Sequence, residues 1–174
     1  MIRPLCAFAA AALCVACADD GTGPDPLPLQ TAEQSAGPVV AIANGSGHRV
    51  RSDRLLTFAF TARLHADGSA DGNYHVDFQN LGVSFDVDVT CMSVDGNRAW
   101  IGGIIRNVVG PIVQEGTVSY FYVTDNGEGA DAVDGISGVR VNDAAGEDQL
   151  FCDQQLTLLT EVPIERGNAQ VKTF

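Results

Sequence analysis

Apolar and polar residues alternate with a period of two throughout the sequence after residue 50. In LLTFAFTARL, residues 55–64, Phe58, Phe60, Ala62 and Leu64 take every second position, with polar or small residues between them. Side chains of a strand point alternately to the two faces of a sheet, so such a segment has one apolar and one polar face. Further strands are predicted at 73–79, 83–91, 98–106, 116–124, 135–141, 150–159 and 168–174.

These segments predict the fold class. Seven or eight short strands with no convincing helical stretch between them are typical of an antiparallel β-barrel or β-sandwich. We therefore expect one all-β domain over residues 50–174, a length that suits a single hydrophobic core. Gly102 and Gly103 lie inside a predicted strand, which indicates a bend or a close approach of two backbone segments.

Residues 73–91 predict a hairpin with a defined register. A two-residue turn at Leu81 and Gly82 would make the apolar faces of the two strands coincide, as a buried face requires. The predicted apolar pairs are Phe78 with Phe85, Val76 with Val87, and Tyr74 with Val89.

The polar face of this hairpin carries a cluster of ionisable residues. The same register would place Asp77 opposite Asp86 and His75 opposite Asp88. General acid–base hydrolysis and cation binding both use paired carboxylates. Opposed like charges also cost little on the solvated face of an acidic protein, because salt screens them. We interpret the cluster as a solvated face, and no catalytic residue is predicted.

The first 16 residues predict a signal peptide. Arg3 precedes an apolar, alanine-rich run of roughly 13 residues, which is too short to cross a bilayer. Residues 15–17 (VAC) resemble the end of a bacterial lipoprotein box, with Cys17 as the lipid anchor, although Cys14 stands where that box usually has leucine. The alternative is ordinary cleavage after Ala18 and a freely secreted protein.

Residues 17–49 predict a flexible tether. The stretch is rich in Asp, Gly, Pro and Thr at its start and has few residues that a core could bury. A tether directly after a lipidated residue suits an exported domain held at the cell envelope. We therefore expect the membrane as a partner, contacted through the N-terminal lipid.

The five cysteines of the chain predict one disulfide. Cys6 and Cys14 belong to the signal peptide, and lipidation of Cys17 would leave Cys91 and Cys152 as an even pair in an oxidising compartment. Period two aligns Cys91 with the apolar residues of its strand, so we expect it to point into the core, with Cys152 on an edge-like C-terminal strand. A metal pair is disfavoured because neither cysteine has a CxxC partner.

Four segments together resemble a recurrent family of exported bacterial β domains with no characterised activity. They are ARLHADGSADGNYHV (62–76), VTCMSVDGNRAWIGGII (89–105), YFYVTDNGEGADAVDGIS (120–137) and PIERGNAQV (163–171). The resemblance extends over most of the chain after Leu55. It implies the β fold and the cysteine pair, and it supplies no catalytic residues.

Charge and one acidic loop limit the classes of ligand. The formal net charge is −12, which disfavours nucleic acid as a partner. The loop DNGEGADAVDG (125–135) contains oxygen ligands of the kind that calcium prefers, but it lacks the EF-hand spacing and occurs only once. We interpret it as a glycine-rich connection and keep these weak metal candidates: Asp125, Asn126, Glu128, Asp131 and Asp134.

Three functional hypotheses remain. The first is a non-catalytic, membrane-tethered envelope domain with a structural or binding role, and it needs no cofactor. The second is a small barrel that encloses an apolar ligand or a cyclase-like active site, which requires polar residues inside the barrel. The third is a calcium-dependent carbohydrate-binding module that uses the 125–135 loop, and Tyr120 and Tyr122 could offer an aromatic platform for a sugar.

Overall fold

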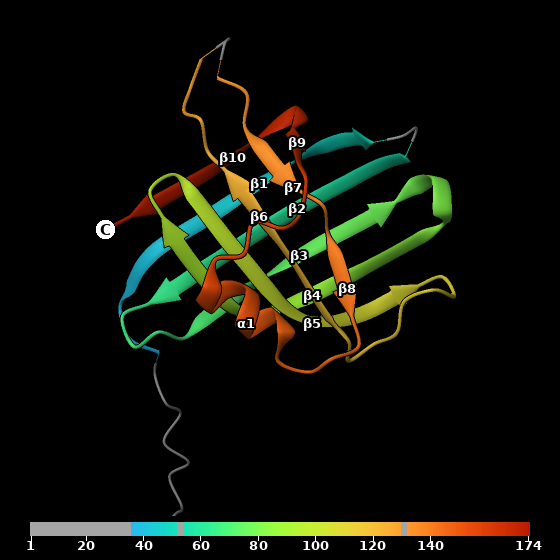
Figure 1. Cartoon of the computed structure of the whole chain (residues 1–174), viewed down its shortest axis with the longest axis horizontal. Helices are drawn as coiled ribbons and strands as arrows, with labels where there is room; N and C mark the ends of the chain where they lie inside the picture. Colours follow the sequence, from blue (N-terminus) through green and yellow to red (C-terminus); the bar gives the residue numbers. More distant parts are fainter. Residues whose placement is uncertain (1–35, 52–53, 130–131) are drawn as a thin grey trace, which may run out of the picture. The chain divides into compact units, whose positions relative to one another are not determined.

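A computed structural model describes residues 36–51, 54–129 and 132–174. In this part of the chain, ten antiparallel strands form one sheet that curls into a nearly closed barrel (Figure 1). The first half of the sheet consists of long strands in sequence order: β1 (Val39–Arg51), β2 (Arg54–His65), β3 (Ala70–Phe78), β4 (Val83–Asp95) and β5 (Arg98–Val109). The all-β, antiparallel fold class is thus confirmed, as a barrel.

Shorter elements complete the barrel. They are β6 (Val118–Thr124), β7 (Gly135–Ser137), β8 (Arg140–Asn142), α1 (Glu147–Gln154), β9 (Glu161–Pro163) and β10 (Glu165–Thr173). The strand order is β10-β1-β2-β3-β4-β5-β6-β7-β9, and β8 pairs with β6. The last strand therefore returns to the first. The signal peptide, Cys17, most of the tether and Asp131 lie outside the described residues.

The boundary predicted for the tether is wrong, because β1 begins at Val39 rather than after residue 49. Four successive inward positions of β1 (41, 43, 45 and 47) carry only alanine and glycine, so this part of the strand lacks the apolar signal of the other strands. Phe60 of β2 explains why: a Cβ atom at Gly45 would lie 2.8 Å from its ring and 2.6 Å from the backbone oxygen of Asn168. Small residues on β1 therefore make room for large rings on β2.

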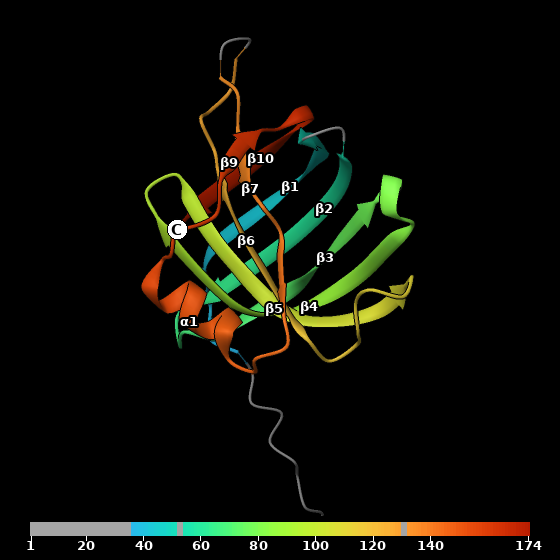
Figure 2. The same cartoon turned by 45° about the vertical axis from the view of Figure 1, so that its right-hand side comes forward.

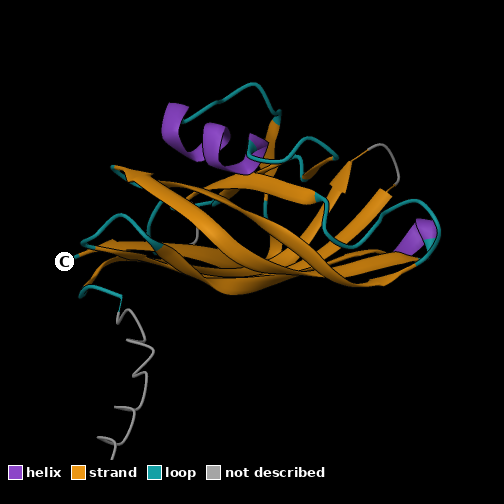
Figure 3. Ribbon diagram, turned by 90° about the horizontal axis from the view of Figure 1, so that it is seen from below, coloured by secondary structure: helices purple, strands orange, loops and turns teal. Residues whose placement is uncertain are grey.

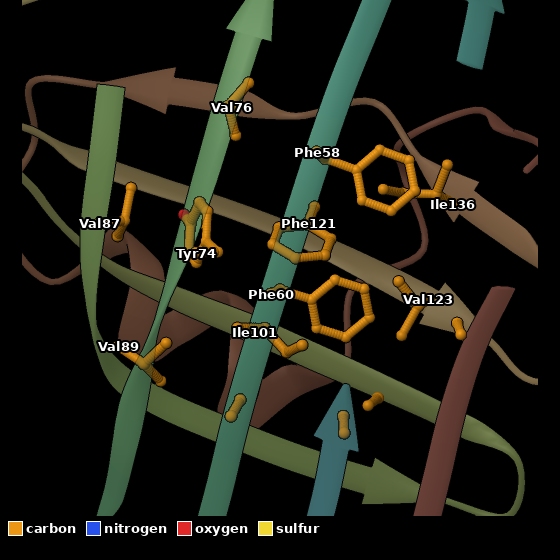
Figure 4. Close-up of a cluster of buried hydrophobic side chains, with 14 of the residues drawn as sticks. Phe58, Phe60, Tyr74, Val76, Val87, Val89, Ile101, Phe121, Val123 and Ile136 are labelled. Carbon is orange, nitrogen blue, oxygen red and sulfur yellow. The ribbon is translucent and has the colours of Figure 1, made fainter. Parts of the chain in front are cut away.

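Aromatic and branched side chains fill the interior of the barrel (Figure 4). The ring of Phe121 meets those of Phe60 and Tyr74 edge-on, with centroids 5.5 and 5.0 Å apart. All three side chains are buried, and burial raises the pKa of the Tyr74 phenol far above its ordinary value. Edge-to-face packing of this kind stabilises a core beyond the area that it buries.

The β3–β4 hairpin has a longer turn than the sequence predicts. A short 3₁₀ helix, Gln79–Leu81, and Gly82 in the left-handed region (φ 59°) connect the strands. Pairing moves by two residues, so that Tyr74 faces Val87, Val76 faces Phe85 and Phe78 faces Val83. The individual predicted pairs are wrong. A shift of two residues keeps every side chain on its predicted face, so the apolar faces still coincide.

The segment predicted as a strand at 150–159 begins as helix α1 and continues as a loop. Phe151 and Cys152 are buried together with Asp148, at the spacing of three and four residues that brings side chains to one face of a helix. The helix lies against the outer surface of the sheet, over β4, β5 and β6 (Figure 3). The sequence predicts no helix in this domain, and α1 shows that this prediction is wrong.

Helix α1 covers a second apolar cluster and carries one half of the disulfide. Cys91 and Cys152 are bonded, with their Cα atoms 6.2 Å apart, as predicted. The register of β4 against β5 shifts between Val89 and Cys91, so Cys91 points to the outer cluster with Trp100 and Tyr122 and not into the barrel. The disulfide thus fixes a helix onto the sheet, and not one strand to another as the sequence predicts.

Gly102 and Gly103 allow two close approaches on β5. A Cβ atom at Gly102 would lie 2.9 Å from the Cβ of Asp148, so its absence lets α1 sit directly on the sheet. A Cβ atom at Gly103 would lie 2.0 Å from the backbone oxygen of Asp88, next to the register shift. The predicted close backbone approach is confirmed at both glycines.

The seam of the barrel lies between β10 and the β6–β7 connection (Figures 1 and 2). Two aspartates of this connection bridge it by hydrogen bonds. Asp134 is buried and accepts hydrogen bonds from the backbone N–H groups of Ala169 (2.7 Å) and Asn126 (2.8 Å). Asp125 accepts from the N–H of Val171 (2.9 Å). These carboxylates occupy the positions that backbone carbonyls of a neighbouring strand would otherwise take.

We predict that Asp134→Ala lowers the free energy of unfolding by about 2–4 kcal/mol, because two backbone N–H groups at a buried position lose their acceptor. Urea denaturation of the purified domain measures the change. Asp143→Ala removes an exposed carboxylate and should alter stability by less than about 0.5 kcal/mol. Equal effects of the two substitutions would contradict the role of Asp134 in the seam.

Candidate functional site

Two rows of outward-facing side chains cross neighbouring strands of the sheet, the first row five strands and the second row six. The strand register aligns one residue per strand in each row, and every second residue of a strand faces outward. From β10 to β4, the first row is Gln170, Asn44, Thr61, Asn73 and Asp88. From β10 to β5, the second row is Asn168, Ser46, Ala59, His75, Asp86 and Arg106.

Most of these residues line an open groove of about 750 Å³ on the outer face of the sheet. Phe60 and Tyr74 form part of its floor, but both are nearly inaccessible, at 4% and 1% exposed. Amide, hydroxyl, imidazole and carboxylate groups therefore provide the chemistry of the surface. Binding sites combine a concave surface with a few convergent polar groups, which makes this groove the candidate site.

A hydrogen-bonded group at the β4–β5 end of the groove is centred on Asp86. The carboxylate receives His75 Nδ1 on Oδ1 (2.7 Å) and the Asn107 side-chain amide on Oδ2 (3.1 Å). The hydrogen bond from His75 holds the pKa of Asp86 below its ordinary value. Arg106 donates to Asp88 on the same surface, at 3.2 Å. The acidic residues here are oriented and partly neutralised.

A β-bulge brings Asn107 onto this face. The register of β4 and β5 shifts between Ser84 and Asp86, and Asn107 has a positive φ of 48°. Arg106 and Asn107 are adjacent in sequence, yet both are exposed and both bond carboxylates of β4. Bulges commonly redirect side chains in this way, and asparagine tolerates the left-handed region better than most residues.

The ionisable cluster predicted on the hairpin is arranged differently in the structure. His75 faces Asp86, Asp77 faces Ser84 and Asp88 faces Asn73. The predicted pairs of Asp77 with Asp86 and of His75 with Asp88 are therefore wrong, because the turn is two residues longer. The outcome is a histidine–carboxylate pair in place of two opposed carboxylates.

Of the polar groove residues, the sequence singles out only His75, Asp86 and Asp88, and four of the others show why. Asn44 and Ser46 fell within the predicted tether, although they alternate with Ala43, Gly45 and Gly47 at period two. That alternation is the signal that could have revealed the strand. Two further residues carried no local signal: Asn107 depends on a bulge, and Asn168 reaches the groove only because β10 pairs with β1.

The candidate calcium ligands of the acidic loop are engaged elsewhere. Asp125 and Asp134 accept backbone hydrogen bonds at the barrel seam, and the Asn126 amide donates to the carbonyl of Val133 (2.7 Å). Glu128 accepts from Gln170 (3.1 Å). Within residues 36–51, 54–129 and 132–174, no group of three or more His, Cys, Asp or Glu side chains is arranged to hold a metal ion.

The aromatic residues of β6 are divided between the two faces of the sheet. Phe121 is inside the barrel. Tyr120 and Tyr122 point outward but are buried beside α1, and the Tyr120 ring lies 4.6 Å from that of Phe151. Helix α1 therefore covers the surface that could have served as an aromatic platform for a sugar.

The three histidines lie in separate hydrogen-bonded groups. His48 contacts the Thr57 hydroxyl (3.1 Å), and His75 contacts Asp86. His65 is buried, with Nε2 2.5 Å from Asp71 and Nδ1 2.6 Å from the carbonyl of Gly37. Both ring nitrogens of His65 face acceptors, so the imidazolium form satisfies both contacts. The Asp71 hydrogen bond is the main cause that raises the pKa of His65.

We predict that the stabilisation from His65 depends on pH. Its folded pKa is raised, so its contribution is complete below the unfolded pKa of about 6.5 and is lost as pH rises through the folded value. The pKa of Asp71 is lowered mainly by the same hydrogen bond, so its contribution is lost as pH falls through its folded value. Urea denaturation should show the stability gap between wild type and His65→Gln narrowing at alkaline pH.

Asp71→Asn tests the cause of this effect. Removing the carboxylate should reduce the pH dependence that His65 confers, since the main hydrogen bond that raises its pKa is lost. A gap between wild type and His65→Gln that widens with rising pH would show that the imidazolium is not the stabilising form.

No protein-family model, curated protein sequence or solved structure matches the chain. Among the helices of the described residues, none is long and apolar enough to cross a membrane. The resemblance to exported bacterial β domains stays an expectation from the sequence. The groove is the surface of the described residues whose chemistry best suits a ligand.

Proposed function

We propose that this chain is an exported, membrane-tethered binding domain of the bacterial cell envelope and that the groove across β10 and β1–β5 is its binding site. The observation that carries the proposal is the pair of register-aligned polar rows in a groove of about 750 Å³. Regular strand pairing holds these side chains at fixed spacing, which lowers the ordering cost of binding a hydrophilic ligand. The tether and the lipid at Cys17 are supported by the sequence alone.

Exposure of the histidine–carboxylate pair favours binding over catalysis. The side chains of His75 and Asp86 are 47% and 46% exposed. Preorganised charges accelerate reactions most in sites that exclude water, because water screens them elsewhere. An exposed pair on an open sheet suits reversible hydrogen bonding to a ligand.

The two other hypotheses have less support. An enclosed apolar ligand would need interior space where Phe60, Tyr74 and Phe121 pack edge to face. A calcium-dependent module would need the carboxylates of Asp125 and Asp134, which accept backbone hydrogen bonds at the barrel seam. Binding in the groove requires neither space inside the barrel nor the carboxylates of the seam.

We predict that Thr61→Arg abolishes binding of the purified domain to the cell-envelope fraction of the bacterium that encodes it. Thr61 is exposed in the middle strands of the groove, so an arginine there fills the groove without entering the core. Thr160→Arg adds the same side chain at an exposed loop position and should bind like the wild type. Co-sedimentation measures both, and equal binding of Thr61→Arg and wild type would overturn the proposal.

The membrane tether has its own test. We expect the mature wild-type protein to partition into the detergent phase and Cys17→Ser to appear in the aqueous phase, since that cysteine is the predicted site of lipid attachment. Detergent phase separation followed by immunoblotting measures the distribution. A water-soluble wild-type protein that starts at Asp19 would show ordinary secretion instead.

A further inference from the structure

The groove has two halves. In one half the lining side chains form no hydrogen bonds to other described residues, and in the other half they are hydrogen-bonded to one another. On β10, β1, β2 and β3, five lining side chains make no hydrogen bond or ion pair with the described residues. All five are amides or hydroxyls, and each such group can both donate and accept a hydrogen bond. They are Asn44, Ser46, Thr61, Asn73 and Asn168.

The charged residues at the β4–β5 end of the groove are paired with one another, so little net charge remains to attract a ligand. Both oxygens of Asp86 are engaged, one by His75 and the other by Asn107. Arg106 offsets Asp88. A metal ion or a polyamine would need several free carboxylates, and an anion would need a surplus of positive charge. The groove therefore suits a ligand that is largely uncharged.

The position of the groove restricts the kind of polymer. It lies on the face of the sheet, where backbone N–H and C=O groups are already paired between strands. Peptides that bind sheets usually add a strand at an edge and insert side chains into pockets. Here the side chains of Phe60 and Tyr74 belong to the barrel core and are almost inaccessible, so they offer no such pocket. Recognition would depend on the polar side chains of the groove, and chiefly on its hydroxyl and amide groups.

The length of the groove favours an extended ligand. Its second row runs from β10 to β5 and so crosses five strand spacings, which corresponds to roughly 24 Å. We propose that the groove binds an extended, neutral glycan chain without a metal ion. Sugar hydroxyls are both donors and acceptors, which matches the five amide and hydroxyl groups. The inference rests on the proposed function of the groove and adds the class of ligand.

Binding of defined oligosaccharides tests the ligand class. Isothermal titration with glucose and N-acetylglucosamine oligomers of two to six units, in EDTA, should show affinity rising with chain length for one of the series. Asn73→Ala, near the middle of the groove, should weaken all lengths roughly two- to tenfold, the loss of one hydrogen bond. Asn168→Ala, on β10 at one end, should weaken only the longer oligomers. Gln154→Ala, exposed on α1, should bind like the wild type.

The possible outcomes separate failure of the glycan inference from failure of the groove as the binding site. Loss of binding in EDTA, or equal effects of Asn73→Ala at the centre and Gln154→Ala outside the groove, would overturn the glycan inference. Absence of any oligosaccharide binding would also overturn it, while envelope binding that still depends on Thr61 would leave the proposed function standing. Envelope binding that is insensitive to Thr61→Arg would instead refute the proposed function itself. Measuring the thermal midpoint of every variant checks that each is folded.

Discussion

Hydrogen bonding of the free edge of β10 is the constraint on which the rest of this structure depends. One edge of the strand pairs with β1, and along the other edge the N–H groups of Ala169 and Val171 need acceptors. Asp134 and Asp125 supply them from the connection after β6. An unpaired sheet edge exposes backbone polar groups and invites association with other chains. Closure by carboxylates satisfies this edge and lets the sheet enclose its aromatic core.

The groove follows from the same closure. Because β10 pairs with β1, Asn168 joins a surface whose other residues come from β1 to β5. Regular pairing aligns the rows, and one bulge in β5 adds Asn107. The interior is packed with rings, so the barrel acts as a rigid support and the ligand chemistry is on its outside. This arrangement separates the residues that stabilise the fold from those that can bind.

Local sequence patterns predicted much of the fold, and their failures have identifiable causes. Alternation of Phe58, Phe60 and Ala62 was sufficient for β2, because side-chain direction in a strand depends only on backbone geometry. The β3–β4 turn was predicted two residues too short, which changed every pair but no face. β1 lacks a local apolar signal because its inward residues are small, and Gly45 in particular makes room for the ring of Phe60 on β2. Residues 150–159 predict a strand where α1 in fact begins, although Asp148, Phe151 and Cys152 have helical spacing.

The candidate site was less predictable than the fold. His75, Asp86 and Asp88 were recognised as a cluster, but their partners depended on a turn length that the sequence left open. Cys91 was paired correctly with Cys152 by counting cysteines, yet a register shift turned it to the outer face. Asp125 and Asp134 looked like calcium ligands because a carboxylate that caps a backbone N–H and one that binds a cation are the same in sequence.

By itself, the sequence determined the all-β class, the faces of the long strands and the cysteine pair, because alternation and cysteine number are local or compositional properties. The tertiary structure alone decided the barrel seam, the position of α1 and the groove. These features join residues far apart in the chain, such as Asn44, Asn107 and Asn168, whose proximity depends on strand order, turn length and a single bulge. Each of those is set by packing and backbone hydrogen bonding across the whole sheet.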